Sequence, residues 1–450
     1  MKQPLLELSA IELRDRLAGG ALRAVDLAEA CLARIDEREP EIQAWAWIDR
    51  DFVLRQARML DAERATGRPV GPLHGLPIGI KDIVDTVRIP TENGTVLDAG
   101  RVPTEDAWIV GALKRAGALV MGKTVTTELA LFAPGKTRNP HNPAHSPGGS
   151  SSGSAAAVAA GMVPLAIGTQ TAGSVIRPAS FCGVAGFKPS FGAVPRTGIL
   201  RQAPSLDTVG VFARSPEEAG LLADALFGHD AADPATTPAP PPRLLDTSMS
   251  APPVTPAIAF VPPPGWEDFA SEEARAAFAE LRDALGDACD EVALPEAFAQ
   301  QNRLREQVQL AELAKSFYTY ENRGRDRLSE QLRNAIDAGK SVLARDYLAA
   351  LDWRAIYNSA LDAIFDRFDV IMTAAAPGPA PLFEEGTGNP VFNGLWTFCG
   401  TPSVSLPLLA AGNGLPIGVQ LVGRRGDDGR LLRTARWLVN HLRAMSGEDR

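Results

Sequence analysis

One uncharged stretch constrains the fold more than any other part of the chain. Residues Ala155–Ile167 are all small or apolar, and Gly161 and Pro164 interrupt the run. The stretch is too short to cross a bilayer, so it predicts a buried helix followed by a buried strand. A strand that is covered on both faces needs helices on either side of its sheet, which indicates an α/β architecture.

The rest of the chain repeats this alternation. Predicted strands at Pro77–Asp85, Val163–Gly168 and Ser403–Pro407 are separated by helical patterns. They predict one large mixed β-sheet sandwiched between α-helices. Residues 231–256 are rich in Pro, Ala and Thr and predict an extended surface connector, followed by a partly independent helical insert to about residue 365. We therefore expect residues 1–450 to form one domain that carries this insert.

Composition argues against several functional classes. The chain is 45% hydrophobic and 22% charged over 450 residues, which suffices for a large core. A net charge of -9 without a basic run argues against nucleic acid as a partner. The 4 Cys are scattered without a Cys-x-x-Cys pair, and the N-terminus has no secretion signal. We expect a cytoplasmic protein with no metal, no cofactor and no membrane partner.

Two loops rich in glycine and hydroxyl groups flank the buried stretch. They are Pro147–Ser154 and Gly168–Pro178. Ser174, in the second loop, precedes a predicted helix start, where unpaired N–H groups are available. A serine that attacks a carbonyl needs such donors to hold the oxyanion. The candidate donors are the N–H groups of Thr171, Ala172, Gly173 and Ser174. The alternative interpretation is that Ser174 only caps the helix.

A nucleophilic serine needs a base, and the sequence offers a lysine rather than a histidine. None of the 5 His has a triad setting, and no G-x-S-x-G elbow is present. Lys81 ends an apolar run, where burial lowers a lysine pKa. The hydroxyl of Ser150, in the first loop, can pass a proton between neighbours. The alternative for Lys81 is a surface lysine paired with Asp82. The alternative for the loop around Ser150 is a flexible glycine–serine linker.

Together these segments resemble the amidase signature family of Ser-Ser-Lys hydrolases. The resemblance rests on Gly75–Asp82, Pro147–Ala157 and Gly168–Pro178, and similar stretches extend it over nearly the whole chain. It implies the mixed sheet between helices that the pattern predicts. It also implies Ser174 as the nucleophile, Ser150 as the bridging serine after a cis Gly149–Ser150 bond, and Lys81 as the base. The implied reaction is hydrolysis of linear amides through an acyl-enzyme. Carbamates (urethanes) are a further candidate substrate class.

The chain departs from the common family pattern at several positions. Gln170 stands where the family commonly has Asp, and Ala172 and Ser152 stand where it often has Gly. Because Ala172 carries a side chain, any requirement for a positive φ in the oxyanion loop must be absent or tolerated. The Gln170 and Ser152 variants are similar to those of small bacterial members of the malonamidase type.

One motif points elsewhere. Gly117–Thr124 fits the phosphate-loop pattern G-x-x-x-x-G-K-[ST]. That motif needs a strand before its first glycine and a helix after its lysine. Here the residues between the two glycines are themselves the predicted strand, so we do not expect a nucleotide site.

The pocket walls are less well defined. Candidate substrate contacts are Leu129, Phe132, Gly149 and Arg177, with Leu131 and Phe181 as further apolar candidates. The apolar side chains fit a protein core equally well, as do Trp396 and Phe398. Arg177 suits a substrate carboxylate such as that of malonamate, but a buried structural ion pair is the preferred interpretation.

These features predict a hydrolase that acts on a small-molecule amide or carbamate, as a monomer or homodimer. Two rival hypotheses stay open. One is the glutaminase-like subunit of a tRNA-dependent amidotransferase, which works only in a complex. The other is a catalytically inactive scaffold or binding module.

Overall fold

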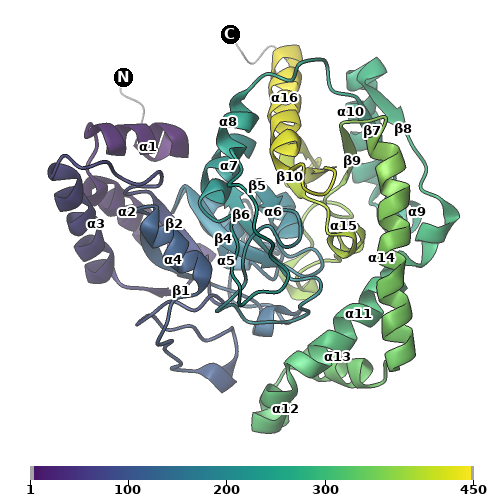
Figure 1. Cartoon of the computed structure of the whole chain (residues 1–450), viewed down its shortest axis with the longest axis horizontal. Helices are drawn as coiled ribbons and strands as arrows, with labels where there is room; N and C mark the ends of the chain where they lie inside the picture. Colours follow the sequence, from purple (N-terminus) through teal and green to yellow (C-terminus); the bar gives the residue numbers. More distant parts are fainter. Residues whose placement is uncertain (1–4, 447–450) are drawn as a thin grey trace.

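The alternating apolar segments form one mixed β-sheet in the computed structural model, which describes residues 5–446. Within these residues the sheet has 11 strands and lies between α-helices (Figure 1). The predicted fold class is therefore confirmed. Among the described residues, no helix is long and apolar enough to cross a membrane.

The strands are paired in an order that differs from their order along the chain. They are β1 (Trp45–Ile48), β2 (Pro77–Lys81), β3 (Leu119–Thr124), β4 (Leu165–Gln170), β5 (Ala185–Lys188), β6 (Thr208–Ala213), β7 (Ile258–Phe260), β8 (Cys289–Glu291), β9 (Val370–Ala374), β10 (Ser403–Ala410) and β11 (Pro416–Val422). Across the sheet they run β1-β3-β2-β4-β6-β5-β10-β11-β9-β7-β8. β2 is parallel to β3 and β4, and β7 is parallel to β8 and β9.

The helices surround this sheet. In the N-terminal half they are α1 (Ala10–Gly19), α2 (Ala24–Ile42), α3 (Arg50–Ala65), α4 (Trp108–Arg115), α5 (Ser152–Ala159), α6 (Ile176–Cys182) and α7 (Pro216–Asp224). In the C-terminal half they are α8 (Leu244–Met249), α9 (Trp266–Phe269), α10 (Glu272–Leu285), α11 (Gln301–Ser316), α12 (Tyr318–Gly324), α13 (Glu330–Lys340), α14 (Ala344–Phe365), α15 (Gly394–Cys399) and α16 (Asp428–Ser446). Helices α11 to α14 gather on one side, away from α1 to α3 (Figure 1).

The pairing of β2 with β4 brings two sequence motifs together. The two strands run parallel, with Ile80 opposite Ile167. Parallel strands end at the same edge of a sheet, so Lys81 at the end of β2 lies beside the residues that end β4. This edge is where the two loops rich in glycine and hydroxyl groups meet.

Helix α5 supports these loops from within the core. It is buried from Ser152 to Val158, and its small side chains let it pack against β2, β4 and α6. The hydroxyl of Ser154 donates a hydrogen bond to the carbonyl of Ile167 at 2.7 Å and shares another with Thr124 at 2.7 Å. The polar groups inside this helix are therefore paired although they are buried.

Two sequence expectations need correction, and one strand was missed. The strand expected at Val163–Gly168 is β4, which begins at Leu165 because Pro164 has no N–H to donate to the sheet. Strand β6 was not predicted as a strand. The connector at 231–256 is not wholly extended, since it contains α8, whose first N–H groups at Leu244 and Leu245 bind the distant carboxylate of Asp224 at 2.6 and 2.9 Å.

The phosphate-loop match is resolved by β3. Gly122, Lys123 and Thr124 all belong to this strand, so no helix follows the lysine. Lys123 is fully buried, and its ammonium group donates to the carbonyl of Val84 and to the hydroxyl of Thr91. The lysine therefore ties β3 to a neighbouring loop.

The close packing of α5 makes a stability prediction. A Cβ added at Gly153 would overlap the backbone of Ala44 and Val125, which cannot rotate away as a side chain can. We expect Gly153→Ala to lower the free energy of unfolding by about 2 kcal/mol, measured by chemical denaturation. Gly19→Ala is the control, because it lies in a helix with nothing within 4 Å. Equal effects of the two substitutions would contradict this packing.

Candidate active site

Lys81 lies at the centre of the site. Its side chain has 0% exposure, and its ammonium nitrogen Nζ donates to Ser150 Oγ at 2.7 Å and to Thr169 Oγ1 at 2.9 Å. Burial lowers the pKa of Lys81 to about 7, and the charge of Asp207 opposes this shift. A substantial fraction of this lysine is therefore neutral near pH 7, as a proton acceptor must be.

The alternative pairing of Lys81 with Asp82 on the surface is wrong. Asp82 is itself buried, and its carboxylate lies 3.7 Å from Nζ of Lys123. Each lysine thus has its own environment: Lys123 faces an acid, whereas the hydrogen bonds of Lys81 end on two hydroxyl groups.

The two serines occupy different settings. Ser150 is buried, follows a cis Gly149–Ser150 bond and is held by a hydrogen bond from the N–H of Thr127 to its carbonyl at 3.2 Å. Ser174 comes directly before Val175, the N-cap residue of α6, and it is only partly buried. The structure joins Lys81 to Ser150, but among residues 5–446 the hydroxyl of Ser174 makes no hydrogen bond.

The loop before Ser174 presents unpaired donors. Within the described part of the chain, the N–H groups of Thr171, Ala172, Gly173 and Ser174 donate to no acceptor. Ala172 does not have a positive φ, so its methyl group is tolerated without backbone strain. These N–H groups can accept a developing negative charge on a carbonyl oxygen.

Gln170 shapes this loop, a role that the sequence did not reveal. Its side-chain oxygen accepts from the N–H groups of Val175 at 2.8 Å and Ile176 at 3.0 Å. Its amide nitrogen donates to Thr397 Oγ1 at 2.9 Å, and Thr397 donates in turn to the carbonyl of Ala172 at 2.7 Å. The glutamine thus fills the position of the usual aspartate with both an acceptor and a donor.

Asp207 holds the other side of the loop. Its carboxylate accepts from the hydroxyl of Thr171 at 2.6 Å and from the N–H groups of Gln202 and Ala203 at 2.9 and 3.0 Å. Burial raises the pKa of Asp207 to about 6. The sequence alone does not pair Thr171 with Asp207, because this contact depends on the tertiary fold.

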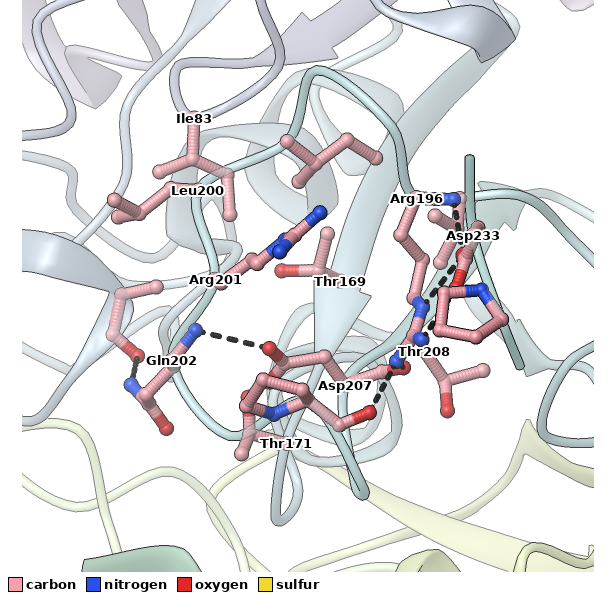
Figure 2. A pocket seen from close by; sticks show the side chains of 15 residues that line it. Ile83, Thr169, Thr171, Arg196, Leu200, Arg201, Gln202, Asp207, Thr208 and Asp233 are labelled. Carbon is pink, nitrogen blue, oxygen red and sulfur yellow. Dashed lines mark hydrogen bonds and ion pairs between the residues drawn. The ribbon is translucent and has the colours of Figure 1, made fainter. Parts of the chain in front are cut away.

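A cavity opens beside this loop. It encloses about 620 Å³, part of it open to solvent, and Thr169, Thr171, Gln202 and Asp207 lie on its wall (Figure 2). Its apolar lining includes Ile83, Ala130 and Leu200, and Arg196 and Arg201 also line it. Because Thr169 also binds the lysine, the cavity lies next to the Lys81 centre.

Arg177 forms no structural ion pair, so that interpretation is wrong. The guanidinium is buried and donates to the carbonyl oxygens of Thr387 and Gly149, each at 2.8 Å. Its Nη1 has no partner, and no carboxylate lies within ion-pair distance among the described residues. Arg177 therefore fixes the peptide that precedes Ser150.

The other predicted pocket residues divide between core and surface. Leu129 and Leu131 are buried in an apolar cluster with residues of α11 to α13, and Leu129 has a left-handed backbone with φ 44°. Phe132 is largely exposed. Gly149 packs against Thr127 and Thr387, and Phe181, Trp396 and Phe398 are core residues. None of these side chains lines the cavity beside Thr171.

Within residues 5–446, no cluster of three or more His, Cys, Asp or Glu could hold a metal.

The role of Gln170 can be tested through stability. Gln170→Leu removes the acceptor of two buried N–H groups, each worth about 1–3 kcal/mol when left unpaired. We expect its free energy of unfolding to fall by about 2 kcal/mol or more in urea denaturation. Thr397→Val, which removes one hydroxyl from the same network, is the milder control, at about 1 kcal/mol. A Gln170→Leu variant as stable as the parent would contradict this assignment.

Comparisons with known proteins identify the family of this chain. A model of the Amidase family matches residues 26–432. The chain is 32% identical over 475 residues to a glutamyl-tRNA(Gln) amidotransferase subunit of Carboxydothermus hydrogenoformans, with 96% of each chain covered. It is 33% identical to the protein of the same name from Chloroflexus aurantiacus, with 95% of each chain covered.

Solved structures of amide-hydrolysing enzymes are also similar to this chain. The peptide amidase from Stenotrophomonas maltophilia superposes with a TM-score of 0.85 and 28% identity over 98% of each chain. A 6-aminohexanoate cyclic dimer hydrolase complexed with substrate superposes with a TM-score of 0.86 and 25% identity over 98% of each chain. With the family matched over most of its length, this chain belongs to the Amidase family and is an amidase signature hydrolase.

Proposed function

We propose that this enzyme hydrolyses a carboxamide C–N bond through an acyl-enzyme on Ser174. The observation that carries the proposal is the hydrogen bond from buried Lys81 to Ser150 at 2.7 Å. Neutral Lys81 takes a proton from Ser150, which takes one from Ser174. The oxygen of Ser174 then attacks the carbonyl carbon, and the N–H groups of the Thr171–Ser174 loop hold the oxyanion.

The remaining steps return the enzyme to its starting state. The proton passes back along the relay to the leaving nitrogen, so the C–N bond breaks and an amine or ammonia departs. Water then attacks the ester on Ser174, and its proton takes the same route. The products are a carboxylic acid and the amine, and no residue changes its oxidation state.

The proposed base makes a prediction about pH. Only neutral Lys81 can accept the proton, so kcat/KM should rise as pH increases through about 7 and level off above that value. Lys81→Met should lose about 10²–10⁴-fold in kcat at neutral pH while keeping its thermal unfolding temperature. Steady-state kinetics with a chromogenic amide measures both effects. A flat pH profile together with a near-normal rate of the variant would rule out the lysine base.

Two contexts for this chemistry differ in substrate and partners. One is an enzyme that works on its own and hydrolyses linear amides, or carbamates, whose carbonyl is attacked in the same way. The other is the glutaminase-like subunit of a tRNA-dependent amidotransferase. The names of the curated relatives favour the second context, because they match over nearly their full length. The amidases among the solved structures support the first.

A purification and a substrate panel distinguish the two contexts. A chain of an amidotransferase complex should co-purify with partner chains from its native source and release ammonia from glutamine chiefly in that complex. An independent amidase should purify without them and hydrolyse at least one of malonamate, aliphatic amides, anilides or aryl carbamates. Ser174→Ala is the control, since contaminating hydrolases would survive this substitution. If the purified chain and its native complex both hydrolysed nothing in the panel, glutamine included, the proposed function would be wrong.

A further inference from the structure

Helix α11 carries an unusual row of polar residues on its buried face. Gln301, Arg305, Gln309 and Glu312 recur at helical spacing and are all buried. Residues of these types are seldom buried unless they have partners. Gln309 and Glu312 bind partners outside the helix, whereas the hydrogen bond of Arg305 goes to Gln309 of the same helix.

The C-terminal part of this row packs on the loop that holds Asp207. The carboxylate of Glu312 accepts from the N–H and hydroxyl of Ser205 at 2.9 and 2.6 Å. The amide nitrogen of Gln309 donates to the side-chain oxygen of Gln202 at 3.0 Å. Gln202 lines the cavity beside Thr171. Gln309 therefore reaches the wall of that cavity from the side of α11.

The other part of the row packs on α15. A Cβ added at Gly394 would lie 2.6 Å from Nε of Arg305, so the guanidinium lies against the first residue of that helix. The preceding residue, Asn393, lies directly against Gly173. Thr397 of the same helix donates to the carbonyl of Ala172 at 2.7 Å.

Arg305 and Gln309 thus connect the two supports of the Thr171–Ser174 loop. One support is α15, which contacts Ala172 and Gly173, and the other is the loop around Asp207, which contacts Thr171. The two side chains therefore lie behind the loop that ends in Ser174. Nothing local in the sequence marks Arg305 as a functional residue.

Arg305 is a buried cation without a counterion. It is 8% exposed, and no carboxylate lies within ion-pair distance of it among residues 5–446. Its Nη1 donates to the side-chain oxygen of Gln309, while its Nε is buried without a partner. Burying an unpaired charge is costly, and guanidinium groups bind carboxylates through two parallel hydrogen bonds. The Nη2 of Arg305 makes no hydrogen bond among the described residues and is not fully buried, so this nitrogen is the one that an anion from outside the chain can reach.

We propose that Arg305 binds a carboxylate of the substrate, and that the substrates are small amides with a carboxylate a few bonds from the scissile carbonyl. This inference rests on the proposed amide hydrolysis and adds the substrate class. Arg177 cannot serve equally well, because its Nε and one Nη are occupied by carbonyl oxygens. Neutral amides and carbamates of similar size lack the group that Arg305 is placed to neutralise.

Matched substrate pairs test the proposal on the unmodified enzyme, with its native partner chains if they co-purify. The pairs are malonamate with malonamide, succinamate with succinamide, and glutaramate with glutaramide. In each pair a carboxylate is replaced by a neutral amide of equal length. We expect kcat/KM for at least one acid to exceed that of its diamide by about 100-fold. Equal rates within every pair would overturn the role of Arg305 and leave the proposed hydrolysis intact. Hydrolysis of no amide at all would overturn both.

Variants locate the effect. Arg305→Gln should lower kcat/KM for the preferred acid by about 100-fold, mainly by raising KM. It should change kcat/KM for the matching diamide by less than about threefold. Arg305→Lys keeps the charge but cannot form two parallel hydrogen bonds to a carboxylate. Its kcat/KM for the acid should therefore lie between the values of Arg305→Gln and of the unmodified enzyme. Arg303→Gln is the matched control, since Arg303 is exposed on the same helix. An equal loss for acid and diamide in Arg305→Gln would mean that the residue acts only through structure.

Discussion

The candidate site depends on one buried ammonium group. Lys81 is fully enclosed, and its hydrogen bonds end on two hydroxyl oxygens rather than on a carboxylate. An acid in direct contact would hold the lysine in its charged form, whereas burial among neutral groups brings its pKa down to about 7. The parallel pairing of β2 with β4 creates this environment, because it places Thr169 and the loop of Ser150 around the end of β2.

The loop before Ser174 is fixed from both sides by residues distant in sequence. Gln170 and Thr397 hold it through Ala172 and the start of α6, and Asp207 holds it through Thr171. Because these bonds use the side chains and carbonyl groups of the loop, its N–H groups stay available. Preorganised donors of this kind stabilise an oxyanion without reorganisation during the reaction. The partly buried Ser174 is thus presented on a rigid support.

The sequence predicted the parts of this site that have local signatures. Small residues around Ser150 and Ser174, and an apolar run that ends in Lys81, are visible in the residues themselves. The mixed sheet followed from the alternation of strands and helices, and the phosphate-loop match failed because Lys123 lies within a strand. The contacts of Gln170 with Thr397, of Thr171 with Asp207 and of Arg305 with α15 could not be predicted, because each joins segments whose proximity only the tertiary fold creates.

The central claim is that Ser174 is the nucleophile and that the Lys81–Ser150 pair activates it. The most direct measurement is covalent labelling with a fluorophosphonate, followed by peptide mapping by mass spectrometry. We predict one adduct, on Ser174, whose rate of formation rises with pH through about 7. Labelling of a different residue, or an enzyme that turns over amides while Ser174 stays unmodified, would contradict it.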